Sequence, residues 1–312
     1  MPVLSDFFYD STDGIHSIHA RKCVPDGAPV AIVQIAHGIA EHINRYDAFM
    51  TFLAENGILA VGNDHLGHGQ SFTNEEDKGF FAENDGWNVV VDDLHKLHEQ
   101  MRGEYPDIPY VFFGHSMGSF LARTYMIRFP DDNAGVIISG TGHQQKLMIT
   151  AGLRMAGILA NKNGAHSVGD ALNSIAFGSY NNKISHPNTP FDWLSRDGAE
   201  VHKYVDDPLC GFIAKTGLYK DMMTGIKFIT DPNNIAKMNK DVPVYFMSGE
   251  ADPVGEYGKG VKRAYKAFCD AGMKDVFIRL YPKGRHEMLN EFNKADVYAN
   301  ILGWIKAKVL CG

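Results

Sequence analysis

The sequence predicts an α/β fold with a mostly parallel sheet, and three observations support this prediction. Short, nearly continuous apolar runs suit strands that are buried on both faces. They alternate with longer stretches in which apolar residues recur every three to four positions, as on one face of a helix. The chain has 312 residues, enough to bury one large core. Regular alternation of strands and helices predicts a parallel sheet covered by helices.

Eight segments have strand patterns, and one long interval between them has none. The strands are expected at residues 7–11, 15–23, 30–36, 58–62, 111–113, 134–139, 242–248 and 276–281. In the long interval only helical patterns recur, at residues 147–159, 170–176, 199–205 and 211–229. We therefore expect an eight-stranded core built from residues 1–142 and 241–312, with an all-helical insertion at 143–240.

Composition excludes several classes of function. The net charge of −7 gives a nucleic-acid partner no electrostatic support. No apolar run approaches 18 residues, and the N-terminus lacks the basic and apolar regions of a secretory signal. The four cysteines lie far apart without C-x-x-C spacing, which fits reduced structural thiols. We therefore expect a cytoplasmic protein that binds no nucleic acid.

The segment Gly114-His115-Ser116-Met117-Gly118 stands between a strand pattern and a helix pattern. In that context G-x-S-x-G is typical of a nucleophile elbow, a sharp turn that exposes the serine above the sheet. The turn is tight, so the residues two before and two after the serine must be small. The amides at the start of the helix would stabilise a developing oxyanion. We expect Ser116 to be a catalytic nucleophile.

A serine nucleophile needs a base, and the base needs an acid that orients it. At this kind of site the chain order is serine, acid, histidine, with the last two in loops after later strands. Of the 14 histidines only His286 lies beyond His202, and it follows the last expected strand. Asp252 follows the strand before that one and is the expected acid, with Glu250 as a nearby competitor. Taken alone, Asp252 could be a turn former and His286 a surface residue.

The oxyanion needs two backbone donors. One is expected from Met117, directly after the nucleophile. The other is expected from Ile39, in the turn after the strand at 30–36, where Gly38 would let the amide point inward. The alternative for the His37-Gly38 pair is an ordinary turn that ends a strand.

Two further polar clusters are interpreted as structural. Asp64, Gly67 and His68 could suggest a metal or phosphate site, but they lack a further defined ligand, so a supporting loop is favoured. The pair Glu41-His42 is expected to orient neighbouring groups near a helix start. Neither a metal nor an organic cofactor is expected in the reaction.

Three motifs together resemble one family. The segment from His37 to Tyr46 is similar to the HG-x-x-EH-x-x-RY signature of the monoacylglycerol lipase and lysophospholipase branch of the α/β-hydrolases. The next two signatures of that branch resemble residues 64–71 and the elbow, at similar separation. The resemblance is close over about residues 25–140 and 240–290. It departs at Ser119, where a second glycine is frequent, and at Ile39, where a smaller residue is usual and the bulk could narrow the acyl entrance.

The resemblance implies an α/β-hydrolase fold in which the helical insertion forms a cap over the active site. It also implies an esterase for single-chain lipids, in which Ser116, Asp252 and His286 form the triad. Around them, His37, Gly38, Glu41 and His115 are expected to support the site. Apolar residues of the cap could line an acyl tunnel or could form a small core of the cap itself: Leu147, Met148, Leu153, Met155, Ile158, Leu159, Phe177, Phe212, Ile213 and Met222.

An exposed apolar patch on the cap could let the enzyme contact membranes or micelles transiently. Two rival classes remain open. One is another hydrolase on the same fold, either a short-chain carboxylesterase or a proline-type aminopeptidase. The other is a non-catalytic ligand-binding protein that kept the fold.

Overall fold

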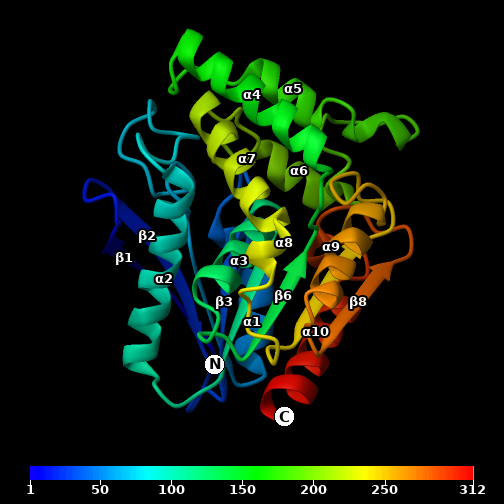
Figure 1. Ribbon diagram of the computed structural model, residues 1–312. Coiled ribbons are helices and arrows are strands. Elements are labelled where there is room, and N and C mark those ends of the chain that lie inside the picture. Colours follow the sequence, from blue (N-terminus) through cyan, green and yellow to red (C-terminus); the bar gives the residue numbers. More distant parts are fainter. Residues whose placement is uncertain (312) are drawn as a thin grey trace.

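One eight-stranded sheet forms the centre of the computed structural model, which describes residues 1–311 (Figure 1). Its strands are β1 (Val3–Asp10), β2 (Ser17–Val24), β3 (Ala31–Ala36), β4 (Ile58–Asn63), β5 (Tyr110–His115), β6 (Gly135–Ser139), β7 (Val244–Gly249) and β8 (Val276–Tyr281). They lie in the order β1-β2-β4-β3-β5-β6-β7-β8. The pairs β1–β2 and β2–β4 are antiparallel, and all others are parallel. The predicted α/β fold with a mostly parallel sheet is confirmed.

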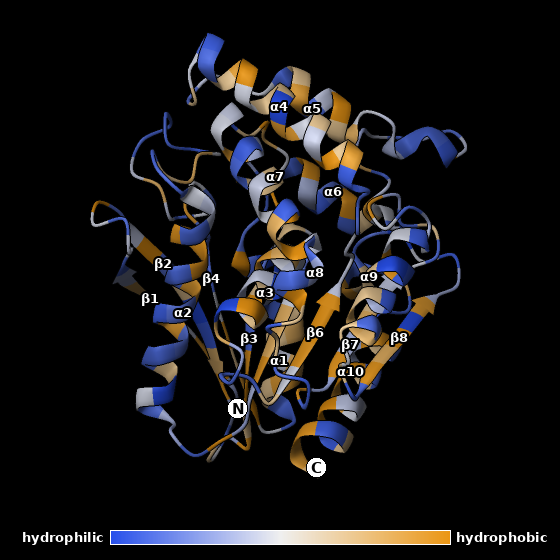
Figure 2. Cartoon of the chain, in the orientation of Figure 1, coloured by the Kyte–Doolittle hydropathy of each residue, from blue (hydrophilic) through white to orange (hydrophobic). Residues whose placement is uncertain are grey.

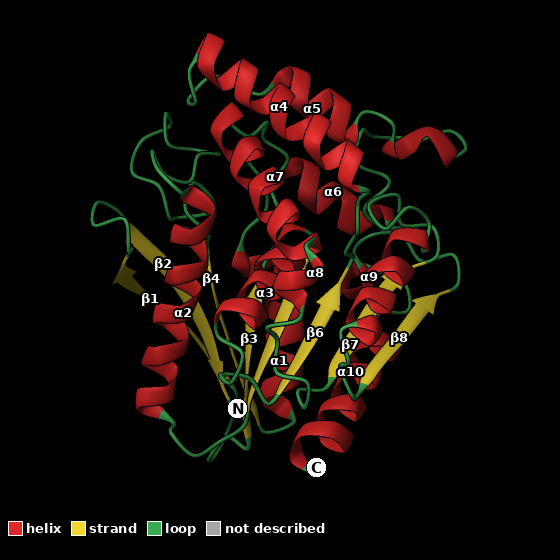
Figure 3. Cartoon of the chain, in the orientation of Figure 1, coloured by secondary structure: helices red, strands yellow, loops and turns green. Residues whose placement is uncertain are grey.

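Helices cover both faces of the sheet because neighbouring residues of each strand point to opposite sides. In β3, Ile32 belongs to one buried cluster and Val33 to the other. The first cluster includes residues of α2 (Gly86–Glu104), α3 (Met117–Arg128) and α9 (Lys259–Asp270). The second includes residues of α1 (Asp47–Glu55) and α10 (Lys294–Ile305). Figure 3 shows these helices around the strands. Two short 3₁₀ helices, η1 (Ile43–Tyr46) and η3 (Met288–Asn290), and a π-helical turn, η4 (Lys306–Leu310), complete the core.

Between β6 and β7 the described chain forms helices and loops, with a single isolated bridge between Val168 and Lys215. The elements are α4 (Lys146–Asn163), α5 (Asp170–Phe177), η2 (Tyr180–Lys183), α6 (Gly198–Asp206), α7 (Thr216–Thr230) and α8 (Pro232–Ile235). Helices α4 and α5 lie above the ends of the strands in Figure 1. The exact division at residues 143 and 240 stays a prediction.

Helix α7 (Thr216–Thr230) begins later than the predicted start at residue 211. Gly211 has a left-handed backbone with φ +67, and its N–H donates to the carbonyl of Ala40 in the core, so the chain cannot be helical there. The helix therefore begins at Thr216. Its buried residues Leu218, Ile226 and Ile229 belong to the cluster that also covers the sheet. Part of the insertion is thus packed as firmly as the core.

Candidate active site

Ser116 occupies a strained turn between β5 and α3. Its backbone has φ 54, ψ −120, a conformation that residues other than glycine rarely adopt. Its N–H donates to the carbonyl of Ser139 on β6, at 2.9 Å. A side chain on Gly114 would overlap the carbonyl of Gly118, and one on Gly118 would overlap the carbonyl of Ala36 at the end of β3. Both glycines are therefore sterically required, which explains the spacing seen in the sequence.

Asp252 is fully buried in the loop after β7, and its carboxylate is held on several sides. Oδ1 lies 3.0 Å from Nδ1 of His286 and accepts the N–H of Val254 at 2.9 Å. Oδ2 accepts the hydroxyl of Ser248 at 2.8 Å. Burial would raise the pKa of Asp252, but these partners hold it below its usual value, so the group is a carboxylate at neutral pH. The competitor Glu250 is exposed and pairs with no histidine in the described chain.

His286 is buried in the loop after β8, between a loop of the insertion and β5. Its N–H donates to the carbonyl of Trp193 at 3.3 Å, and the two rings lie 5.1 Å apart. Burial alone would lower the pKa of His286, but the charge and hydrogen bond of Asp252 outweigh it and raise the pKa above its usual value. The ring of His115 lies 4.6 Å away. Burial, together with the charge of His286, lowers the pKa of His115 to about 4, so His115 is neutral.

Ser116 and His286 line the same cavity of about 410 Å³. Ser116 Oγ and His286 are not joined by a hydrogen bond within residues 1–311. Such bonds are often long in an unliganded site and shorten when substrate binds. The structure thus brings together Ser116, His286 and Asp252, which lie far apart in the sequence.

The loop after β3 closes one side of the cavity. A side chain on Gly38 would approach Cβ of Ser116 to 3.1 Å and would displace the carboxylate of Glu41. The N–H of Gly38 donates to Oε1 of Glu41 at 2.5 Å. Gly38, Ile39, Glu41 and His115 all line the cavity, whereas Met117 lies buried at the start of α3. The predicted oxyanion and supporting residues therefore meet around Ser116, except for His37.

His37 faces away from the cavity and into a group of three buried histidines. Its Nε2 accepts the N–H of His65 at 3.0 Å, and its ring lies 4.0 Å from that of His65 and 5.3 Å from that of His68. Burial lowers the pKa of all three, to about 3 for His65 and about 4 for His68. They are neutral at physiological pH. His37 supports the loop through these contacts and through a bond to the carbonyl of Gly38.

The loop at residues 64–71 is tied to the core through the side chain of Asp64. The carboxylate of Asp64 contacts Nδ1 of His19 at 2.7 Å and accepts the amides of Ile43 and Gln70, each at 2.8 Å. These bonds occupy the carboxylate oxygens that a metal would need.

A buried ion network below the cavity was not found from the sequence. The Arg45 guanidinium contacts Glu41 at 2.5 Å and Glu287 at 2.7 and 2.8 Å, and the hydroxyl of Tyr46 donates to Glu41. Burial would raise the pKa of Glu287, but Arg45 lowers it to about 2. Since Glu41 binds Gly38 and Glu287 follows His286, Arg45 links the two loops that flank Ser116. In the sequence, this network is indicated only by the Arg-Tyr pair that ends the first motif and by the acid directly after His286. Because 242 residues separate Arg45 from Glu287, no local pattern links them.

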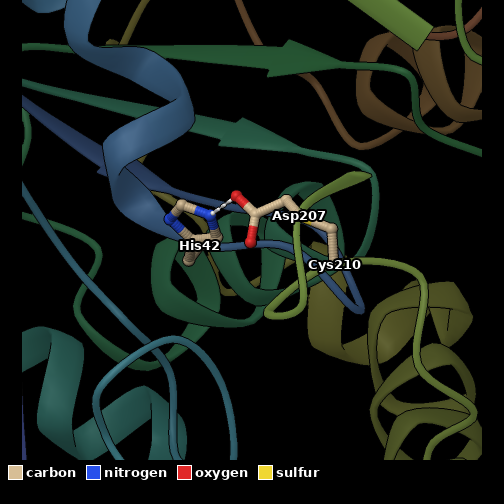
Figure 4. Close-up of side chains that lie close together, drawn as sticks. All are labelled: His42, Asp207 and Cys210. Atoms are coloured by element: carbon tan, nitrogen blue, oxygen red, sulfur yellow. Dashed lines mark hydrogen bonds and ion pairs between the residues drawn. The ribbon is translucent and has the colours of Figure 1, made fainter. Parts of the chain in front are cut away.

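A second contact joins the same loop to the insertion. Figure 4 shows His42 and Asp207 side chains facing one another, with Nε2 and Oδ2 at 2.8 Å, beside the buried thiol of Cys210. These three residues, and the group His95, His98 and Glu99, are arranged so that a metal could be held within the described chain. Neither group includes Ser116, Asp252 or His286. His42 orients the insertion rather than the reacting groups.

The insertion supplies most of the cavity wall. Only some of the residues that were expected to line the cavity do so. The lining includes Phe177, Phe212 and Ile213. Leu147, Met148, Met155 and Ile158 are exposed instead, because α4 packs on α7 and turns these side chains outward. Met222 lies in the main core. The lining from the insertion that the sequence did not predict is Asn173, Ser174, Gly178, Asn181, Pro190, Phe191, Trp193, Leu194, Tyr204, Gly211 and Tyr219.

Comparisons with known proteins decide the family. The family model described as serine aminopeptidase, S33 (Hydrolase_4), matches residues 27–293. The chain belongs to this family. The α/β-hydrolase is 26% identical over 298 residues to the monoacylglycerol lipase of Mycolicibacterium smegmatis, covering 90% of each chain. It is 25% identical over 296 residues to the monoglyceride lipase of Rattus norvegicus, covering 94% of this chain and 88% of the relative.

A comparison with solved structures also places the chain among ester hydrolases. The crystal structure of a thermostable carboxyl esterase from Bacillus coagulans in complex with glycerol superposes with a TM-score of 0.91, at 27% identity, over 98% of this chain and 99% of that one. The α/β-hydrolase resembles monoglyceride lipases over nearly its whole length and is a carboxylic ester hydrolase. Among residues 1–311, none of the helices has the length and hydropathy of a membrane span.

Proposed function

We propose that this α/β-hydrolase cleaves carboxylic esters of single-chain lipids, either a monoacylglycerol or a lysophospholipid, into a fatty acid and an alcohol. The cavity beside Ser116 carries this proposal. Its wall from the insertion consists of aromatic, apolar and uncharged polar side chains, with Phe177, Phe191 and Phe212 among them. Such a wall suits an acyl chain near the reacting ester. The names of the rat and mycobacterial relatives point to the same substrate class.

In the proposed mechanism Ser116 attacks the ester carbonyl while His286 takes its proton. The carboxylate of Asp252 holds the His286 ring through Nδ1–H and stabilises the imidazolium that forms. The amides of Ile39 and Met117 would bind the tetrahedral oxyanion. The Met117 amide suits this role because it is the first of α3 and has no partner within the helix. His286 then protonates the leaving alcohol and later activates water, which releases the fatty acid from the acyl-enzyme.

The electrostatics of the cavity favour this ester hydrolase over an aminopeptidase. An N-terminal amine would need a carboxylate near the nucleophile, and the insertion contributes none to the lining. Two carboxylates of the core, Glu41 and Glu287, do line the cavity, but both are paired with Arg45. Arg45 therefore offsets part of their charge and holds both carboxylates in place. A short-chain carboxylesterase remains the second candidate, favoured by the likeness to the Bacillus coagulans esterase.

We also assign residues 143–240 to a cap that contacts lipid assemblies transiently. The support is an exposed apolar row on α4, where Leu147, Met148 and Ile158 are 80%, 64% and 66% exposed. These side chains lie on the outside of the insertion, where Figure 2 shows apolar stretches on α4. Exposed apolar surface of this kind is typical of interaction sites. The cytoplasmic location stays a prediction.

Fatty-acid release by mass spectrometry tests the proposal. The substrates are monoacylglycerols, lysophosphatidylcholine, short-chain esters and a proline anilide, with Ser116→Ala as the blank. We expect rapid release from one of the two lipids, abolished in the variant. Turnover of the short esters alone would contradict the lipid substrate, and cleavage of the anilide alone would contradict the ester mechanism. No turnover of any substrate would favour a binding protein.

A further inference from the structure

A second cluster of metal-ligating side chains lies away from the catalytic loops. His95 and His98 stand one turn apart on α2 beside Glu99, and Asp132, in the loop between α3 and β6, contacts both histidines. The ring of His98 lies 4.2 Å from that of Tyr110, the first residue of β5. Ser116 follows the last residue of the same strand. The cluster therefore lies at the amino-terminal end of β5, whereas the cavity lies at its carboxyl end.

His98 has a buried nitrogen without a partner. The residue is 3% exposed, and its Nδ1 makes no hydrogen bond within residues 1–311. Its Nε2 lies 3.3 Å from the backbone carbonyl of Asp132, and a carbonyl can only accept, so Nε2 carries the hydrogen. The lone pair of Nδ1 then faces Oδ2 of Asp132 at 3.8 Å. Two acceptors facing one another repel unless a cation or a proton lies between them.

His95 presents a second nitrogen to the same carboxylate oxygen. Its Nδ1 lies 3.2 Å from Oδ2 of Asp132 and 3.0 Å from the hydroxyl of Tyr125. Its ring stacks on Phe129 at 3.8 Å and 7°, which fixes its orientation. Its Nε2 lies 4.0 Å from a carboxylate oxygen of Glu99. Histidines that bind metals commonly direct the other ring nitrogen to a carbonyl or a carboxylate, as His98 does toward the carbonyl of Asp132.

We propose that His95 Nδ1, His98 Nδ1 and Asp132 Oδ2 form a binding site for a divalent cation of the zinc type. Two imidazoles and one carboxylate are a ligand set that zinc accepts, with water in the fourth position. In tetrahedral zinc, ligand atoms lie ~3.3 Å apart. The observed separations of 3.2 and 3.8 Å from Asp132 Oδ2 need only small adjustment. His95 and Asp132 are partly exposed, at 28% and 26% of their side chains, so a cation and its water can enter.

The charges around this site favour a cation. Asp132 and Glu99 are acidic, and Arg102, whose Nη2 donates to the Asp132 carbonyl, is the opposing charge nearby. The hydroxyl of Tyr125 donates to Asp132 Oδ2 at 2.8 Å and lies 3.0 Å from His95 Nδ1. A cation on His95 Nδ1 therefore requires the tautomer in which Nε2, on the side of Glu99, carries the hydrogen. A bound cation would clamp α2 to the loop that leads into β6, so its role is to stabilise the fold rather than to act in ester cleavage.

Titration of the metal-free full chain with Zn²⁺ and with Co²⁺ tests this proposal. We expect one site, and a rise in melting temperature of roughly 5 °C when free Zn²⁺ is 100 times its Kd. His95→Gln, His98→Phe and Asp132→Asn should each weaken binding at least tenfold. The matched control is His166→Gln, which removes another histidine paired with a glutamate, Glu83, at the surface. It should bind as the unmodified chain does.

The Co²⁺ complex separates this site from the His42, Asp207 and Cys210 group. Bound through nitrogen and oxygen, Co²⁺ should show visible d–d bands without the near-ultraviolet band of a sulfur ligand. Three results would overturn the proposal: no stoichiometric binding, a sulfur band, or binding unchanged in the partly exposed His95→Gln variant. His95→Gln removes little buried surface, so circular dichroism can verify that it is folded.

Discussion

The side chains at the carboxyl ends of the strands are closely packed, whereas α4 of the insertion turns most of its apolar side chains outward. All residues of α3 except Arg128 are buried, but only Ile149 and Ala156 are buried on α4. Close packing holds each group at the strand ends in one place, which nucleophilic catalysis requires. The outer insertion has no such constraint. We infer that reaction chemistry resides in the strand ends and that contact with the lipid phase resides in the insertion.

The largest effect should follow from breaking the Asp252–His286 contact. Asp252→Asn removes the charge that orients the base, so we expect kcat to fall about 10⁴-fold. In the unmodified enzyme kcat/KM falls as pH drops through the pKa of His286, which lies above its usual value. In the variant the charge of Asp252 is gone, so the effect of burial dominates and lowers the pKa of His286. The acid limb of the pH profile should therefore move to lower pH. Stopped-flow assays on a soluble ester measure both quantities.

The exposed neighbour Glu250 gives the matched control for that experiment. Glu250→Gln removes an acid only two residues away but leaves the carboxylate that His286 contacts. It should keep the activity and the pH profile within about twofold, as a surface substitution does. A large loss in Glu250→Gln with little loss in Asp252→Asn would reverse the assignment of the acid.

A smaller but still severe effect should follow from removing the cation below the cavity. Arg45→Gln would leave two buried carboxylates without their cation and should cost about 3–5 kcal/mol of unfolding free energy. The folded pKa of Glu287 is about 2, below about 4.3 in an unfolded chain, so this stabilisation is present above pH ~4.3 and is lost as pH falls toward 2. Urea unfolding at pH 7 and pH 3 should therefore show a smaller difference between variant and unmodified chain at pH 3.

The control for Arg45 is Arg128, which pairs with Asp92 at the surface. Arg128→Gln should cost less than about 1 kcal/mol, because exposed ion pairs contribute little. Equal costs for the two variants would contradict the role given to the buried network.

Adding one methyl group compares the two regions directly. Gly118→Ala would place Cβ against the Ala36 carbonyl and should cost about 1–3 kcal/mol, with loss of activity because the elbow must shift. Gly157 on α4 has open space around it, so Gly157→Ala should stabilise the chain by up to about 1 kcal/mol. Thermal unfolding of both variants tests the contrast. A destabilised Gly157→Ala would mean that α4 is more tightly packed than described.

The smallest effect should come from the exposed row on α4. Replacing Leu147 and Ile158 by serine should change the unfolding free energy by less than about 0.5 kcal/mol, since neither is buried. Turnover of a soluble ester should stay the same, while turnover of micellar monoacylglycerol should fall a few-fold. Parallel assays on the two substrates give the ratio. An equal fall for both substrates would contradict a role confined to lipid contact.

The same contrast explains what could be predicted from the sequence. The elbow was predictable because steric limits select glycine at positions 114 and 118 and so leave a local pattern. Asp252 and His286 were predictable by position, because catalytic groups follow parallel strands. The sequence favoured Asp252 over Glu250, and the fold supports that choice because it buries Asp252 and exposes Glu250.

The arrangement of the insertion was harder to predict. Helical spacing identified α4 but could not say which side its apolar residues face, so Leu147 and Ile158 were wrongly considered as tunnel lining. The Arg45–Glu287 pair joins distant parts of the chain and leaves no local pattern. The cation site proposed at His95, His98 and Asp132 likewise depends on how α2 meets the loop before β6.

Labelling with a fluorophosphonate, followed by intact-mass analysis and peptide mapping, tests the central claim most directly. The account predicts one adduct per chain, on the peptide that contains Ser116, absent in Ser116→Ala and formed much more slowly in Asp252→Asn. Labelling at another residue, or equal labelling of Ser116→Ala, would show that the strand-end geometry does not make Ser116 the nucleophile.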